Sequence, residues 1–280
     1  MNSSITFYYK KLQLVSIDVV MGACLMCYLS AFVLDIDVHW SVYFVLATSV
    51  WLVYTLDHLL DAKSIKGQAN TTRHLFHQEY FNVLIYTWLV FFIMTGIVTL
   101  VFLPTITIRY GILALIIVVF HLMLVKLLGT KVAPYIQKEL GVGMAYVVGI
   151  TVGPFSLSEQ IPTYFYVFGL EVFVLAMINL FQFSYFDHEV DQYQNQTSIS
   201  RNLGRSMTRY LIYTLFLIVG ILCCVGFIFF PSYAIVQFIL TCNALTLALI
   251  TLKEDYFHQN ERYRMLGDFV FIYPVILFLI

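Results

Sequence analysis

Charged residues are scarce in this chain. Asp, Glu, Lys and Arg make up 11% of its 280 residues, whereas hydrophobic residues make up 61%. Soluble globular domains carry about a quarter charged residues, so this composition excludes a soluble globule. It predicts a polytopic membrane protein, and we expect residues 1–280 to form a single integral domain in the lipid bilayer.

Cysteine is sparse as well, and so is any sign of cleavage after the first apolar run. The five cysteines all fall inside apolar segments, where we interpret them as small packing residues rather than as a redox or zinc motif. No small-residue cleavage site follows the first apolar run, so we expect that run to be retained as a first membrane span. The formal net charge of -1 points to no particular partner, and we expect no nucleic-acid partner.

Nine apolar segments indicate membrane-spanning helices, each of which needs about 20 mostly apolar residues. The segments are Leu12–Leu34, Trp40–Leu56, Phe81–Leu103, Tyr110–Leu128, Leu140–Gly153, Tyr164–Phe186, Tyr210–Phe230, Tyr233–Leu252 and Leu266–Ile280. Pro104, Pro154 and Pro231 stand at the expected turns between spans. The sequence therefore predicts an all-α bundle of nine transmembrane helices.

Positive charge is confined to one side of this topology. Nine crossings place fourteen of the fifteen Lys and Arg residues on the same face, and only Arg109 on the other. The fourteen are Lys10, Lys11, Lys63, Lys66, Arg73, Lys126, Lys131, Lys138, Arg201, Arg205, Arg209, Lys253, Arg262 and Arg264. Cytoplasmic loops carry an excess of Lys and Arg, so we expect the N-terminus and these loops in the cytoplasm and the protein in a bacterial cytoplasmic (inner) membrane.

One short motif occurs twice on the basic face. Asp57-His58-Leu59-Leu60-Asp61 ends the second span, and Asp187-His188-Glu189-Val190-Asp191 ends the sixth. Residues four apart lie on one face of a helix, so each motif predicts a pair of carboxylates that point the same way. Four crossings separate the two motifs, which is the pattern of a four-span unit repeated twice.

Carboxylates that face one another suit a hard divalent cation such as Mg²⁺, which binds a few carboxylates together with substrate phosphates. We therefore predict that Asp57, Asp61, Asp187 and Asp191 hold Mg²⁺ and, through it, a lipid diphosphate. Nearby basic residues are candidates for binding the phosphate oxygens, namely Lys63, Lys66, Arg73, Arg201 and Arg205. The positive-inside bias alone also places Lys and Arg in these loops, so both interpretations stand.

Two polar residues inside the sixth span lie below the second motif. Asn179 and Gln182 precede Asp187 by about two turns and about one turn. Polar residues inside a membrane face the bundle interior, so these two are candidates for binding the diphosphate or its acceptor. Hydrogen bonding between helices is an equal alternative.

The histidines allow a different metal chemistry. His74 and His77, together with His58, His188 and His258, are of the residue type that binds iron, as in the di-iron centre of a membrane desaturase or hydroxylase. Those enzymes need more histidine clusters than this chain offers. We keep this hypothesis as the lesser alternative.

At the aspartate motifs the chain resembles the UbiA-type intramembrane prenyltransferases, which are nine-span helical proteins with two Asp-rich motifs at the cytoplasmic ends of spans two and six. The second motif is similar to the family's pattern over Asp187-x-x-x-Asp191-x-x-x-Asn195-x-Thr197 and Ser200-Arg201-Asn202-Leu203-Gly204-Arg205. Family members often have Gly or Asp where Asn195 stands. The first motif is incomplete, because Val53 and Tyr54 replace the family's Asn and leading Asp.

The resemblance implies a central cavity between the nine helices. It also implies a Mg²⁺-dependent transfer of a prenyl group from a prenyl diphosphate to a small aromatic or lipid-like acceptor. It adds Asn195 to the candidate substrate-binding residues. The incomplete first motif supports an alternative from another class, a non-catalytic descendant of the family that binds a polyprenyl lipid or serves as a scaffold.

Overall fold

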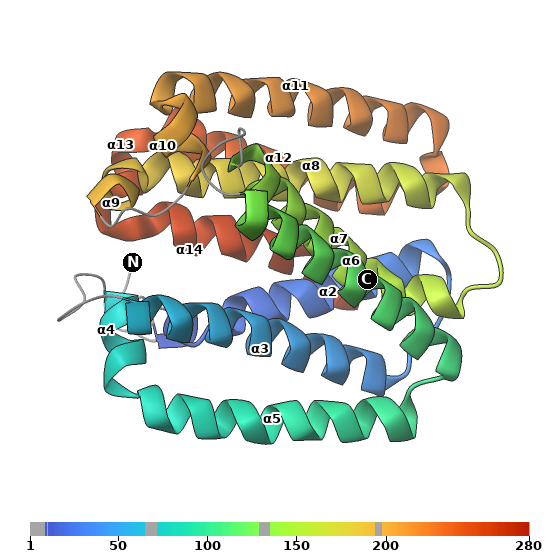
Figure 1. Ribbon diagram of the computed structural model, residues 1–280. Helices are drawn as coiled ribbons and strands as arrows, with labels where there is room; N and C mark the ends of the chain where they lie inside the picture. The colour runs from blue at the N-terminus through green and yellow to red at the C-terminus, as the bar shows by residue number, and fades with distance from the viewer. Residues whose placement is uncertain (1–8, 10, 65–71, 129–134, 194–197, 280) are drawn as a thin grey trace.

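The computed structural model describes residues 9, 11–64, 72–128, 135–193 and 198–279, and within these ranges every regular element is helical (Figure 1). The prediction of an all-α protein is therefore confirmed. The helices are α2 (Ile17–Val33), α3 (Trp40–Ser64), α4 (Thr72–Glu79), α5 (Phe81–Phe102), α6 (Thr105–Leu128), α7 (Tyr135–Leu157), α8 (Thr163–Phe186), α9 (His188–Tyr193), α10 (Ile199–Leu203), α11 (Arg205–Phe229), η2 (Pro231–Tyr233), α12 (Ala234–Leu252), α13 (Glu254–His258), η3 (Gln259–Glu261), α14 (Arg262–Phe269) and η4 (Val270–Leu279).

Each predicted span coincides with a helix, although the number of crossings stays a prediction. Within the described part of the chain, six helical segments are long and apolar enough to cross a membrane. Two shorter apolar ones, Ile17–Val33 and Thr105–Ile117, lie at the first and fourth predicted spans. The last predicted span falls on α14 and η4. The protein is thus an integral, multi-pass membrane protein.

One predicted turn is wrong. Pro154 lies inside α7 rather than after it. Proline removes one backbone donor. Here it lies in the last turn of α7, where the carbonyl oxygens of Gly153 and Pro154 still accept hydrogen bonds. The Ser156 hydroxyl donates to the Gly153 carbonyl oxygen at 2.8 Å, and the Ser158 N–H donates to the Pro154 carbonyl oxygen at 3.2 Å. Pro104 and Pro231 lie at helix boundaries, as predicted.

The core of the bundle is centred on α8. In its membrane-spanning window 67% of residues are buried, against 6% for α5, whose apolar side chains face outward. Helix α8 packs against α7, α10, α11, α12 and α14. A helix that is apolar on all sides is stable at the periphery only where lipid replaces water, so α5 indicates a lipid-facing position.

Helices α3 and α8, which carry the two aspartate motifs, run in the same direction. Their C-terminal ends lie at the same end of the bundle, where α4, α9, α10 and α13 are also found (left side of Figure 1). The topology thus brings the two motifs to one face. Whether the two halves form a repeat of four spans stays a prediction.

Candidate functional site

The second motif is held by the junction of α8 and α9. Asp187 caps the C-terminus of α8, and the Asp191 N–H donates to the Asp187 carbonyl oxygen at 2.8 Å. This hydrogen bond between residues four apart is the helical one that the sequence predicts for the pair. Both side chains are half-buried, so the two carboxylates lie on successive turns at the surface of the bundle end.

The Asp187 carboxylate contacts two residues of α14. The Tyr263 hydroxyl donates to its Oδ1, and the Arg264 guanidinium donates to its Oδ2. The guanidinium also lies over the Phe183 ring, 5.4 Å from the ring centre. Burial lowers the pKa of Arg264 and the adjacent Asp187 carboxylate raises it, with a net rise above its ordinary value. Arg264 is therefore a permanently charged cation that is paired with Asp187, a predicted metal ligand.

Sequence reasoning missed Arg264 as a site residue and counted it only among the basic residues of the cytoplasmic face. It stands 77 positions after Asp187, and no local spacing connects them. The only signal in the sequence is its place just before the last apolar segment, on the same face as both motifs.

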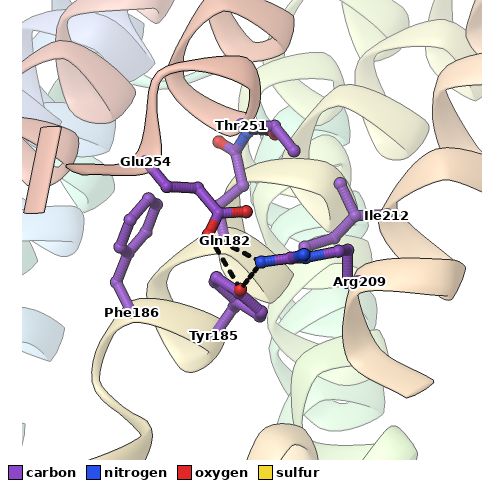
Figure 2. Close-up of a pocket in the computed structure, with 7 residues that line it drawn as sticks. All are labelled: Gln182, Tyr185, Phe186, Arg209, Ile212, Thr251 and Glu254. Atoms are coloured by element: carbon purple, nitrogen blue, oxygen red, sulfur yellow. Dashed lines mark hydrogen bonds and ion pairs between the residues drawn. The ribbon is translucent and has the colours of Figure 1, made fainter. Parts of the chain in front are cut away.

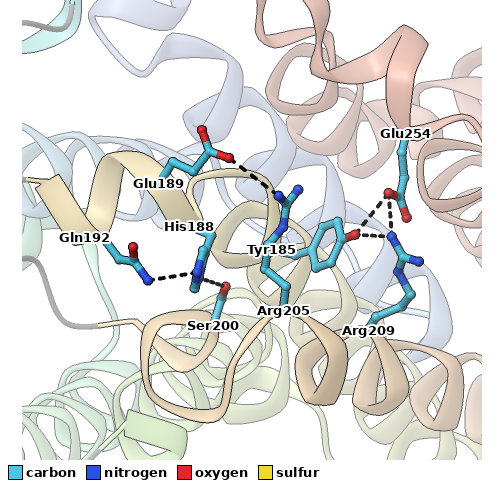
Figure 3. A network of polar contacts seen from close by, with 8 residues as sticks. All are labelled: Tyr185, His188, Glu189, Gln192, Ser200, Arg205, Arg209 and Glu254. Carbon is cyan, nitrogen blue, oxygen red and sulfur yellow. Dashed lines mark hydrogen bonds and ion pairs between the residues drawn. The ribbon is translucent and has the colours of Figure 1, made fainter.

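His188 is fixed by hydrogen bonds on both ring nitrogens. Its Nδ1 lies 2.7 Å from the Ser200 hydroxyl, and its Nε2 lies 2.9 Å from the Gln192 amide nitrogen (Figure 3). A ring with both nitrogens engaged has no lone pair for a metal. This arrangement does not favour the di-iron hypothesis, and it gives His188 a role in holding α10 against α9.

The segment after the second motif is docked onto α7 and α8 through backbone donors. The Ser200 N–H donates to the Ser184 hydroxyl at 2.9 Å, and the Ile199 N–H donates to the Glu139 carboxylate at 3.0 Å. Ser198 caps α10 by accepting from the Arg201 N–H at 3.4 Å. Gly204 then links α10 to α11 with φ of 82°, a conformation that side chains disfavour.

Two arginines of α11 gather around one aromatic ring. The guanidinium carbons of Arg205 and Arg209 lie 4.9 Å and 5.2 Å from the centre of the Tyr185 ring. Arg209 pairs with Glu254 at 2.6 Å, and Arg205 lies 3.7 Å from Glu189 (Figure 3). The predicted phosphate ligand Arg205 therefore faces one carboxylate, that of Glu189, and one aromatic ring in this structure.

Tyr185, Arg209 and Glu254 border a small hollow between α8, α11, α12 and the start of α13 (Figure 2). At its base Gln182 donates to the Leu247 carbonyl oxygen and to the Thr251 hydroxyl, both at 2.6 Å. These are bonds between α8 and α12. Of the two roles that the sequence leaves open for Gln182, the contacts are those of interhelical hydrogen bonding.

The first motif lies at the end of α3, next to α4. Asp57 and Lys63 are exposed, whereas His58 is buried with its ring 5.0 Å from that of His77. The Gln78 amide donates to the Ala62 carbonyl oxygen at 3.0 Å and so fixes α4 on α3. Four candidates are not described in full: Lys66 and Asn195 lie outside the described residues, and so do the side chains of Asp61 and Arg73.

The donor set fits Mg²⁺ in part. Among the described side chains no group of three or more His, Cys, Asp and Glu residues is arranged to hold a metal ion. Mg²⁺ is usually bound through only one or two carboxylates, with substrate phosphates and water as its other ligands. Asp187 and Asp191, on successive turns of one helical segment, can supply those two carboxylates.

A cavity lies inside the bundle below the two motifs. It has about 50 Å³ of room for the centres of water molecules. Its walls come from α2, α3, α7, α8 and the α14–η4 segment, through Val19, Gly22, Tyr54, Val142, Gly143, Tyr146, Ala176, Asn179, Leu180, Asp268 and Phe271. Tyr54 precedes Asp57 by about one turn and Asn179 precedes Asp187 by about two, so the cavity opens below the end that carries the aspartates.

No protein-family model matches the sequence, and no curated protein matches it. A solved structure does match. It is a UbiA homologue from Archaeoglobus fulgidus bound to DMAPP and Mg²⁺, with a TM-score of 0.59 over 96% of this chain and 99% of that one, at 10% sequence identity. At this low identity the match shows a similar fold and gives no information about the residues of the site. The expected fold class is confirmed on this evidence: the chain has the UbiA-type membrane fold.

Proposed function

We propose that this protein transfers a prenyl group from a prenyl diphosphate to a small aromatic or lipid-like acceptor within the membrane, in a Mg²⁺-dependent reaction. The observation that carries the proposal is the position of the Asp187–Asp191 pair. It lies at the bundle end that also carries Asp57, above an internal cavity. The fold is shared with a protein solved with DMAPP and Mg²⁺.

The aspartates have the first role in this proposal. Asp187 and Asp191, with Asp57 and Asp61 from the other motif, would hold Mg²⁺ and keep the diphosphate at the mouth of the cavity. Bound Mg²⁺ supplies charge neutralisation that makes pyrophosphate a better leaving group. The basic candidates, with Asn195, would donate hydrogen bonds to the phosphate oxygens; they are Lys63, Lys66, Arg73, Arg201 and Arg205.

The bundle interior has the second role. The departing prenyl group carries allylic cation character, which aromatic faces stabilise and water destroys. Tyr54, Tyr146 and Phe271 line the cavity, and Phe186 stacks on Tyr263 with ring centres 4.5 Å apart beside Asp187. These rings give the reacting carbon an apolar, electron-rich surrounding.

The proposed location is a bacterial cytoplasmic membrane with both motifs facing the cytoplasm, where soluble diphosphates are available. The support is the distribution of Lys and Arg, of which only Arg109 falls on the opposite side of the nine-span topology.

A non-catalytic lipid-binding or scaffold protein is the second candidate. It is favoured by Tyr54 at the position of the family's leading Asp, and by Arg264, which pairs with Asp187 as a structural partner does. An enzyme loses its function when Asp187 or Asp191 is changed to Asn, whereas a scaffold that is still expressed keeps it.

The test is the melting temperature of the detergent-solubilised protein with Mg²⁺ and pyrophosphate, measured alone and together. A ligand that binds only the folded state at a hundred times its Kd stabilises that state by about 2.7 kcal/mol. We expect the pair of ligands to raise the melting temperature, and Asp57→Ala or Asp187→Ala to remove most of the rise. Glu159→Ala, on the opposite face of the topology, is the control. An unchanged rise in both aspartate variants shows that the motifs do not form one site.

Turnover is tested separately with radiolabelled prenyl diphosphates and a cytosolic extract as the source of acceptor. Absence of Mg²⁺-dependent product with every chain length rejects the enzyme and leaves the lipid-binding alternative.

A further inference from the structure

We infer that Glu171 is a proton-binding site inside the membrane, and that it keeps its proton at a pH where exposed carboxyl groups are ionised. Glu171 lies in α8, about 12 Å after the start of the helix and about 24 Å before Asp187 at 1.5 Å per residue. In a hydrocarbon layer of about 30 Å, this depth is away from both surfaces. Glu171 therefore takes no part in the chemistry proposed at the bundle end.

The Glu171 side chain is fully buried beside neutral groups. It is 0% exposed, and among the described residues it makes no ion pair. The titratable groups beside it are the Tyr164 phenol of α8 and the Cys223 thiol of α11, whereas α12 contributes the Gln237 amide. Phenols and thiols are neutral at neutral pH. An ionised carboxylate without a paired cation is costly to bury, so the neutral acid is the favoured form.

The hydrogen bonds around Glu171 are short of donors. The Gln237 Nε2 lies 3.0 Å and 2.9 Å from the two carboxyl oxygens of Glu171, and 2.8 Å from the Tyr164 hydroxyl. An amide nitrogen has two hydrogens, so it cannot fully serve three acceptor atoms. The Gln237 Oε1 is itself buried with no partner among the described residues. A proton on Glu171 adds a donor where acceptors are in excess.

The packing favours a proton over a metal ion as the bound cation. Gly226 of α11 lies so close to Gln237 that an added Cβ would come within 2.1 Å of the amide nitrogen and 2.7 Å of the amide oxygen. A metal ion needs a shell of oxygen ligands around it, and an amide packed this closely leaves no space for one between the helices. Loss of the proton would leave a negative charge between α8, α11 and α12. The bound proton thus stabilises the contact of these three helices.

Infrared spectroscopy of the full chain in lipid vesicles tests the site at about pH 6, where an exposed glutamate is ionised. The spectrum of Glu171→Gln is subtracted from that of the unmodified chain, so the other carboxyl groups cancel. We expect the difference to contain the carbonyl band of one protonated carboxyl group, which shifts in heavy water. Gln237→Leu, which removes the amide donor, should move this band without abolishing it. Glu159→Gln, at an exposed position, is the matched control and should give only carboxylate bands.

The pH dependence of unfolding tests what the proton does for packing. The folded state binds this proton more tightly than the unfolded chain, so stability falls as the pH rises through the range in which only the folded state is protonated. Between about pH 5 and about pH 7, the unfolding constant of the unmodified chain should rise several-fold per pH unit relative to that of Glu171→Gln, with about ten-fold as the limit for one proton. Glu159→Gln should follow the unmodified chain.

Carboxylate bands in the difference spectrum of Glu171→Gln at about pH 6 overturn the inference, because they show that Glu171 is ionised. The same pH dependence of unfolding in Glu171→Gln and in the unmodified chain overturns it as well. Neither measurement uses Mg²⁺ or a diphosphate, so both outcomes are separate from that of the proposed function.

Discussion

The Asp187 carboxylate is paired with an arginine, Arg264, whereas an empty metal-binding carboxylate at a solvated site would be hydrated. Its two oxygens are taken up by Tyr263 and Arg264, and the two charged side chains are only 14% and 27% exposed. A divalent cation can bind this carboxylate only if the guanidinium gives way. When a diphosphate is present, its oxygens offer the guanidinium a new partner, so the metal and the diphosphate should bind better together than alone.

The Arg264→Met variant tests this exchange. Removing the guanidinium leaves Asp187 with one neutral donor, and we expect the protein to lose about 1–3 kcal/mol of stability because a partly buried charge loses its partner. Mg²⁺ alone should then raise the melting temperature of the variant more than that of the unmodified chain, since no cation competes for Asp187. Pyrophosphate should add less in the variant.

Arg262→Met is the matched control for that experiment. Arg262 lies two positions away with its guanidinium carbon 4.3 Å from the Tyr256 ring centre, and it has no ion pair with Asp187 among the described contacts. Equal Mg²⁺ responses in Arg264→Met and in the unmodified chain are incompatible with competition at Asp187.

At the residue scale the sequence predicts what local spacing can encode. The helical step from Asp187 to Asp191 is one such feature, and the hydrogen bond between their backbones matches it. The partners of those residues depend on how α14 packs on α8, which no local pattern encodes. For this reason the sequence does not predict the contact of Arg264 with Asp187. It allows two roles for Gln182, and the contacts with α12 are those of hydrogen bonding between helices.

At the scale of elements, the contact between α11 and α12 depends on one glycine. The Gln237 amide of α12 donates to the Tyr164 hydroxyl at 2.8 Å and to Glu171 at 2.9 Å and 3.0 Å. The same amide group lies against Gly226 of α11, where an added Cβ would come within 2.1 Å of the Gln237 Nε2. The amide cannot move away without breaking its hydrogen bonds to Tyr164 and Glu171 of α8. Helices α8, α11 and α12 are therefore tightly packed at this point.

We therefore predict that Gly226→Ala destabilises the protein by about 1–3 kcal/mol through overpacking. Gly220→Ala, on the same helix with nothing within 4 Å of the new Cβ, should be neutral or slightly stabilising, since alanine favours helix over glycine by up to about 1 kcal/mol. Thermal unfolding in detergent measures both. Equal melting temperatures for the two variants would mean that Gln237 repacks without loss.

Long and short elements differ in how far hydropathy predicts them. The long helices follow from runs of apolar residues, because a span needs only length and hydrophobicity. The short helices α9, α10 and α13 were not predicted. Helices of that length do not form alone, and α10 is held by Ser184 and Glu139 from other helices. These short helices shape the bundle end at which the aspartates lie.

At the scale of the whole molecule, the proposed function requires both motifs on one side of the membrane. The fold places the ends of α3 and α8 together (Figure 1), and the charge distribution predicts that this end faces the cytoplasm. Arg109, exposed near the start of α6, lies after an odd number of predicted spans and so marks the opposite side. Three exposed positions thus report on the topology: Lys63, Glu189 and Arg109.

We predict that Lys63→Cys and Glu189→Cys react with a membrane-impermeant maleimide from the same side of sealed vesicles, and that Arg109→Cys reacts only from the other. The five native cysteines lie in the predicted spans, so the unmodified chain, labelled in parallel, gives the background. Inverting the vesicles should reverse the pattern for all three variants. If Lys63→Cys and Glu189→Cys label from opposite sides, then Asp57 and Asp187 are separated by the bilayer, and no four-carboxylate site can exist whatever the fold.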